Sequence, residues 1–264
     1  MEQINFLSTD GLEIFGHISS PKYHSPSHAL LLISGGIHGG AKFDNGLYDP
    51  LHIEITDYLN SNGFLTFIVD KRGSKGYSTS YKRKIDFCGK EVDDIAEGGK
   101  FLKSLPELSD KSISIHGTSR GSTLAALIIS RSNLFTSAIL SSGFYDIRSQ
   151  YEYELKNRPE MFPTNKVLNG RRIEDFPCDT LSPINLVDRV DCPVLIVHGF
   201  DDEIVLLEQS TRYYERLREL GKRVRMITYP NLAHFKKYSF PSNPIGELYW
   251  KDCISFLKNE KEYT

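Results

Sequence analysis

The sequence lacks any apolar run approaching the roughly 20 residues that a membrane-spanning helix needs. Its amino terminus also lacks the pattern of a secretory signal peptide. The sequence also lacks a large excess of either charge, since 32 Lys and Arg nearly balance 34 Asp and Glu and leave a net charge of −2. This balance argues against the strongly basic surface typical of proteins that bind nucleic acid or anionic membranes. We therefore expect a cytoplasmic protein with neither nucleic acid nor a membrane as partner.

Cysteine is scarce, with four residues in a chain of 264. They are widely scattered and form no C-x-x-C pair: Cys88, Cys178, Cys192 and Cys253. This spacing argues against a disulfide framework and against the common zinc sites. We expect buried thiols in a reducing compartment, no metal site and no cofactor.

Short apolar runs alternate with amphipathic stretches along most of the chain. After a predicted hairpin over residues 3–18, strands are predicted at 29–33, 64–69, 112–117, 138–140, 193–197 and 224–229. Helical patterns separate many of them, at 50–60, 92–102, 206–220 and 245–258. Continuous apolar runs are typical of parallel strands that are buried on both faces. The alternation predicts one α/β domain over residues 1–264, with a mostly parallel sheet covered by helices on both faces.

Residues 144–190 interrupt this pattern. They are rich in aromatic residues and proline, and they directly follow a predicted strand. Ligands of α/β proteins bind at the carboxyl ends of the strands, so we interpret this stretch as a small cap over that edge. Tyr145 and Phe162 are its candidate substrate-binding residues. The alternative interpretation is a peripheral excursion with no role in binding.

Ser119 lies between Gly117 and Gly121, in the pattern G-x-S-x-G. A predicted strand precedes it and a predicted helix follows it, which is the context of a nucleophile elbow. Such a turn holds the serine hydroxyl clear of the sheet, at a helix N-terminus that favours developing negative charge. The alternative is a Gly/Ser turn that merely caps a helix.

Two later predicted strands each end at a residue that could complete a catalytic triad. Asp201 and Asp202 follow the strand at 193–197, and His234 follows the strand at 224–229. The carboxyl ends of parallel strands meet at one edge, so these side chains can converge on Ser119. In a triad the histidine takes the serine proton, and the aspartate orients the imidazole and offsets its charge. The order Ser, Asp, His is that of the α/β-hydrolase fold.

Several motifs resemble those of the prolyl oligopeptidase (S9) family of α/β-hydrolases. Residues 70–77 read D-K-R-G-S-K-G-Y and resemble the family's D-x-R-G-S-x-G-Y. Residues 198–205 resemble its H-G-x-x-D-x-x-V, and residues 229–234 fit its Y-P-x-x-x-H ending. The resemblance implies the α/β-hydrolase fold. In its register Asp202, rather than Asp201, is the triad acid.

The loop after the strand at 29–33 departs from the family's H-G-G-P, because residues 34–37 read S-G-G-I. The resemblance implies an oxyanion hole formed by the backbone N–H groups of Gly36 and Arg120. His38-Gly39-Gly40 is a competing match to the same family motif. We interpret the side chain of Arg120 as part of a structural ion pair, with a contact to a substrate carboxylate as the alternative. Arg72 is interpreted in the same way, as an internal brace.

The best-known members of this family carry an N-terminal β-propeller that filters substrates by size, and 264 residues leave no room for one. We therefore expect a serine hydrolase that acts on a small-molecule or short-peptide substrate through an acyl-serine intermediate. Cleavage of a short peptide or an amide is the leading interpretation. A carboxylesterase, thioesterase or acyltransferase on the same scaffold is the second. A catalytically inactive hydrolase fold used for binding is the third.

Overall fold

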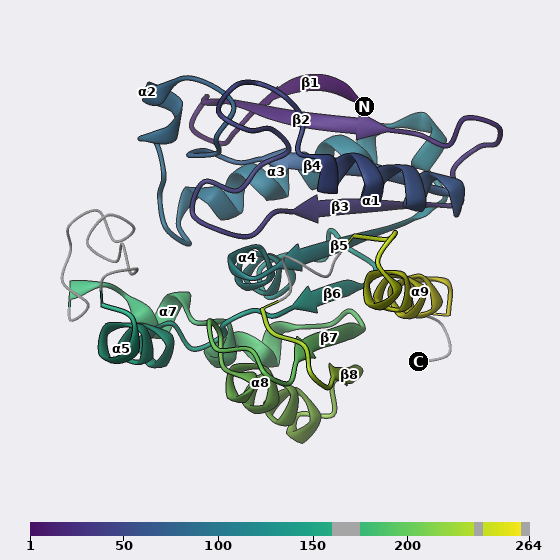
Figure 1. Ribbon diagram of the computed structural model, residues 1–264. Helices are drawn as coiled ribbons and strands as arrows, with labels where there is room; N and C mark the ends of the chain where they lie inside the picture. The colour runs from purple at the N-terminus through teal and green to yellow at the C-terminus, as the bar shows by residue number, and fades with distance from the viewer. Residues whose placement is uncertain (160–174, 235–239, 260–264) are drawn as a thin grey trace.

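The computed structural model describes residues 1–159, 175–234 and 240–259. Strands of this part form one sheet in the order β1-β2-β4-β3-β5-β6-β7-β8 (Figure 1). Their bounds are β1 Glu2–Leu7, β2 Glu13–Ser19, β3 His28–Ile33, β4 Phe64–Asp70, β5 Ser112–Thr118, β6 Ala138–Ser141, β7 Val194–Gly199 and β8 Val224–Tyr229. Strand β2 runs antiparallel to both of its neighbours, and from β4 onward the pairs are parallel. The predicted mostly parallel sheet is confirmed.

Helices cover both faces of the sheet, as predicted. The helices on one face are α3 (Lys90–Ser104), α4 (Arg120–Ile129) and α8 (Leu207–Glu219), and those on the other are α1 (Pro50–Ser61) and α9 (Pro244–Lys258). Alternate strand residues point into the cores on the two faces. Leu31 packs into the core under α3, α4 and α8, and Leu30 packs into the core under α1 and α9. Burial on both faces explains why the central strands have continuous apolar sequences. A short α2 (Thr79–Lys82) and the 3₁₀ turn η1 (Pro106–Leu108) complete this part of the chain.

The segment after β6 lies at the carboxyl edge of the sheet. In Figure 1 the arrowheads of β3, β5 and β6 point left, toward the side on which α5 (Ile147–Asn157) and α7 (Cys178–Leu181) lie. The 3₁₀ helix η3 (Pro183–Arg189) then leads back to β7 and contacts α8 and α4. Helices α5 and α7 thus lie on the side where the strand-end loops meet, whereas η3 returns along α4 and α8 to the amino end of β7.

All four cysteines are free thiols. Cys88, Cys178 and Cys253 are buried, and Cys192 is partly exposed. Burial raises the pKa of the Cys88 thiol to about 12, so this thiol stays neutral at ordinary pH. No helix in the described ranges combines the length and the hydrophobicity needed to cross a lipid bilayer.

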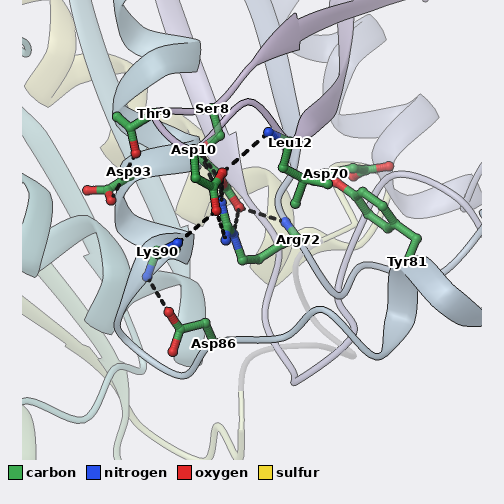
Figure 2. Close-up of polar contacts among 11 residues, drawn as sticks. Ser8, Thr9, Asp10, Leu12, Asp70, Arg72, Tyr81, Asp86, Lys90 and Asp93 are labelled. Atoms are coloured by element: carbon green, nitrogen blue, oxygen red, sulfur yellow. Dashed lines mark hydrogen bonds and ion pairs between the residues drawn. The ribbon is translucent and has the colours of Figure 1, made fainter.

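A buried ion-pair cluster joins the amino-terminal hairpin to the loop after β4 and to α3 (Figure 2). Arg72 is 4% exposed, and it donates from Nε (2.8 Å) and Nη2 (2.7 Å) to the fully buried carboxylate of Asp94. Its Nη1 and Nη2 also donate to Asp10, at 3.0 Å each. Ser8 donates to Asp94 at 2.5 Å. Arg72 is therefore an internal brace between three segments.

We expect Asp94→Ala to lower the free energy of unfolding by about 3 kcal/mol, measured by urea denaturation. Removing one partner of a buried ion pair costs about 3–5 kcal/mol, and Asp10 still pairs with Arg72 here, which favours the lower end. Asp93→Ala is the matched control, since the carboxylate of Asp93 accepts only an exposed hydrogen bond from Thr9 among the residues that the structure describes. That control should change stability by about 0.5 kcal/mol or less. Equal losses in the two variants would contradict a bracing role for Asp94.

Candidate active site

Ser119 occupies a sharp turn between β5 and α4. Its backbone has φ 55° and ψ −124°, which is rare for any residue with a Cβ. The turn requires both neighbouring glycines. A Cβ on Gly117 would lie 2.2 Å from the carbonyl oxygen of Gly121, and one on Gly121 would lie 2.4 Å from that of Ile33. The G-x-S-x-G spacing thus reflects how closely strand, turn and helix pack.

Three side chains from three strand ends form a hydrogen-bonded chain. The Nε2 of His234 lies 3.0 Å from the Oγ of Ser119, and its Nδ1 lies 2.7 Å from the Oδ2 of Asp202. Ser119 follows β5, Asp202 follows β7 and His234 follows β8. The parallel sheet brings them to one edge although His234 and Ser119 are 115 residues apart in the sequence.

Asp202 rather than Asp201 contacts the imidazole. Its side chain is fully buried, and its Oδ1 accepts the backbone N–H groups of Ile204 (2.9 Å) and Val205 (3.0 Å). Burial acts to raise the pKa of Asp202, but hydrogen bonds from His198, His234 and the backbone outweigh it and hold the pKa well below its ordinary value. Asp202 is therefore charged at neutral pH, whereas Asp201 lies exposed at the surface.

The two predicted oxyanion-hole donors come from two separate segments, the start of α4 and the loop after β3. Arg120 is the first residue of α4, and Gly36 has φ +77°, a left-handed conformation suited to glycine. No hydrogen-bond acceptor among the described residues takes either backbone N–H. In the competing match His38-Gly39-Gly40, the carbonyl of Gly39 accepts from Ser74 at 2.8 Å, and the N–H groups of Gly39 and Gly40 likewise have no acceptor among the described residues.

The side chain of Arg120 is internal. Its Nη2 lies 2.6 and 2.5 Å from the two carboxylate oxygens of Glu91, which is fully buried. Its Nη1 donates to the carbonyl of Ile37 at 2.9 Å, and its guanidinium lies 4.9 Å from the centre of the Phe87 ring. These contacts correspond to the structural ion pair of the sequence interpretation.

Tyr145, predicted to bind substrate, lies in the core instead. Its side chain is fully buried, stacks on Tyr213 at 4.2 Å and has its hydroxyl 2.9 Å from the Oγ of Ser122. The physical reason is alternation in the extended chain that follows β6. Tyr145 faces inward, while its neighbour Phe144 is partly exposed and stacks on Phe87 at 6.5 Å. Phe162, the other predicted pocket residue, lies outside the described residues.

A cavity of about 310 Å³ adjoins Ser119 and His234. Its walls come from the glycine-rich loop after β3 and from residues that sequence reasoning missed: Asp49, Leu51, His52, Ile55, Lys75, His116, Ile204 and Trp250. His52 lies 2.9 Å from the Oγ of Ser34 through its Nε2, and burial lowers the pKa of its imidazole. One sequence signal could have indicated this wall. It is Asp49-Pro50, which marks the start of α1 soon after a glycine-rich loop.

This arrangement can activate a serine. The imidazole can accept the proton of the Ser119 hydroxyl, while the charged carboxylate of Asp202 offsets the positive charge that forms. The N–H group of Arg120, the residue after Ser119, and that of Gly36, which lines the same cavity as Ser119, remain the donors expected to stabilise a developing oxyanion. Within the described ranges, no three or more His, Cys, Asp or Glu side chains are grouped so that they could hold a metal ion.

Sequence comparison relates the chain to known peptidases. A family model described as the prolyl oligopeptidase family matches residues 52–260. The uncharacterized peptidase YuxL of Bacillus subtilis (strain 168) is 24% identical over 246 residues, which are 88% of this chain and 35% of YuxL. The uncharacterized peptidase YtmA of the same organism is 26% identical over 231 residues, 86% of this chain and 83% of YtmA.

Solved structures share the fold. The acylaminoacyl peptidase of Pyrococcus horikoshii matches with a TM-score of 0.81 and 23% identity, over 98% of this chain and 41% of that one. A puromycin-hydrolyzing peptidase of Mycobacterium tuberculosis matches with a TM-score of 0.79 and 18% identity, over 98% of this chain and 39% of that one. The chain thus spans about two fifths of these structures and about a third of YuxL. With a family match over most of its length and the sheet of an α/β-hydrolase, this chain belongs to the prolyl oligopeptidase family of serine hydrolases.

Proposed function

We propose that this chain hydrolyses short peptides or other small amides through an acyl-serine intermediate. Ser119 is the nucleophile, His234 the general base and acid, and Asp202 the carboxylate that orients the imidazole. The observation that carries the proposal is the hydrogen-bonded chain from Ser119 through His234 to Asp202.

The reaction has two halves. In the first, the Oγ of Ser119 attacks the substrate carbonyl carbon while His234 takes the hydroxyl proton. The carbonyl oxygen becomes an oxyanion next to the N–H groups of Gly36 and Arg120. His234 then gives its proton to the leaving nitrogen, the carbon–nitrogen bond breaks, and an ester to Ser119 remains. In the second half, water gives a proton to His234 and attacks the ester carbon. The bond from this carbon to the Oγ of Ser119 then breaks, His234 passes the proton to the Oγ, and the acid is released.

Family membership supports a peptide or amide over other acyl substrates. The solved relatives are named as an acylaminoacyl peptidase and as a puromycin-hydrolyzing peptidase, and the curated relatives are named as peptidases. We also propose that residues 144–190 cap the acyl side of the site. Helices α5 and α7 lie on the carboxyl side of the sheet, and the partly exposed Phe144 stacks on Phe87.

A panel of peptide anilides and peptide esters with matched acyl groups tests the proposal. We expect turnover of the anilides as well as of the esters, since the site has a general acid that can protonate a leaving nitrogen. Ser119→Ala measured with the same panel gives the background rate. Turnover of esters with no turnover of any anilide would contradict the peptidase proposal and identify an esterase.

A further inference from the structure

The cavity beside His234 can receive a leaving group. His234 must return its proton to the leaving nitrogen, so that nitrogen has to lie next to its Nε2. Ser119, His234 and Gly36 line the cavity, whereas no described residue of 143–190 does. A leaving group next to the Nε2 of His234 can therefore extend into this cavity, while the segment that follows β6 is left for the acyl group.

The walls of this cavity are mostly apolar. Leu51 and Ile55 come from α1, Trp250 comes from α9, and Ile204 comes from the loop after β7. Its volume of about 310 Å³ is near the lower limit for small-ligand pockets, which run from about 300 to 1,000 Å³. A space of this size fits one or two amino-acid residues and favours an apolar side chain among them.

One wall carries the ammonium group of Lys75, which interacts with the charge of Asp44 without forming an ion pair with it. Lys75 lines the cavity, and its Nζ lies 4.6 Å from the centre of the ring of Phe43, which is 37% exposed. In the part of the chain that the structure describes, no carboxylate forms an ion pair with this Nζ. An ammonium on an aromatic ring at the edge of an apolar pocket can attract an anion strongly, because water screens it less there than on an open surface.

The carboxylate of Asp49 also lines the cavity, and its charge is already engaged. Its Oδ1 accepts the backbone N–H of Leu51 at 3.0 Å, and it caps the N-terminus of α1. The first turn of α1 favours negative charge, which further offsets the charge of Asp49. The buried Nδ1 of His52, which has no hydrogen-bond partner in the described part of the chain, adds a polar group to the lining.

We propose that this cavity binds a short leaving group that ends in a free carboxylate, with Lys75 as the residue that recognises the carboxylate. The favoured substrates are peptides from which one apolar carboxy-terminal residue, or two, is removed. This specificity rests on the proposed peptidase function of Ser119. It adds a binding site for the part of the substrate beyond the cleaved bond.

A pair of substrates that differ only at the carboxy terminus tests the proposal: N-acetyl-Ala-Ala-Leu as the free acid and as the amide. We expect kcat/KM for release of the last residue to be about tenfold or more higher for the acid, as a charged hydrogen bond to Lys75 would give. Lys75→Met should remove this preference by lowering kcat/KM for the acid alone. Lys75→Arg should keep most of it, and Lys84→Met, at an exposed lysine outside the cavity, should leave it unchanged.

A second measurement needs no variant. A carboxylate such as 4-phenylbutyrate should inhibit the wild-type enzyme more strongly than its amide does. Equal kcat/KM for the acid and the amide in the wild-type enzyme, or equal losses on both with Lys75→Met, would overturn the inference.

Labelling of Ser119 by a small fluorophosphonate separates the two proposals. A labelled enzyme without the preference contradicts this inference alone, whereas an unlabelled enzyme contradicts the proposed function.

Discussion

Ser119→Ala should abolish covalent labelling by a fluorophosphonate and lower kcat by about 10⁴- to 10⁶-fold, as removal of a triad serine does in other hydrolases. The reagent reacts with a serine hydroxyl only where a base takes its proton, and His234 is placed at 3.0 Å to do so. Mass spectrometry of the intact protein should show one adduct on the wild type and none on the variant. Steady-state turnover of a peptide anilide measures the change in kcat.

Ser80→Ala is a suitable control, because Ser80 is exposed and its side-chain hydrogen bond goes only to Ser78 among the described residues. This variant should label and turn over as the wild type does. An adduct that persists on Ser119→Ala would place the nucleophile elsewhere. A well-folded wild-type protein that never labels would support the third interpretation, a hydrolase fold used only for binding.

Asp202→Asn should lower kcat by about 10⁴-fold while the protein stays folded. The side-chain oxygen of asparagine can still accept the N–H groups of Ile204 and Val205, which keeps the loop in place. The amide nitrogen would then face the Nδ1 of His234 and hold the imidazole in the tautomer that carries its proton on Nε2. That tautomer cannot accept the proton of Ser119. Single-turnover kinetics and circular dichroism would measure the two parts of this prediction.

Asp201→Asn is the matched control, since it makes the same chemical change one residue away at an exposed side chain. We expect its kcat to stay within about threefold of the wild type, in line with the small effects of surface substitutions. The opposite result, a large loss with Asp201→Asn and a small one with Asp202→Asn, would assign the role of the acid to Asp201.

The sheet and the converging loops could be predicted because each depends on a local sequence pattern. Ser119, Asp202 and His234 each directly follow a recognisable strand, and parallel strands bring such positions to one edge. The choice between Asp201 and Asp202 could not be made from periodicity, because both follow the same strand. It came from the spacing of the family motif, and the structure gives the same pairing, with Asp202 at 2.7 Å from the imidazole.

The cavity could not be predicted, because its walls come from segments far apart in the sequence. His52 and Lys75 line one cavity with Trp250 only because α1 and α9 cover the same face of the sheet and the loop after β4 reaches the same edge. Tyr145 was misassigned for a related reason. Its aromatic character was visible in the sequence, but the side to which it points depends on the path of the chain after β6. A one-residue change in phase exchanges Tyr145 and Phe144 between core and surface.

The backbone at Ser119 shows where this fold accepts a loss of stability. A residue with a Cβ in so rarely populated a conformation costs about 1–3 kcal/mol, out of a total stability of about 5–15 kcal/mol for a typical domain. Glycine would relieve this cost at the same position, so selection for stability alone would not retain a serine there. The turn at Ser119 therefore lowers stability in exchange for reactivity. The packing of helices on both faces of the sheet supplies the free energy that offsets this loss.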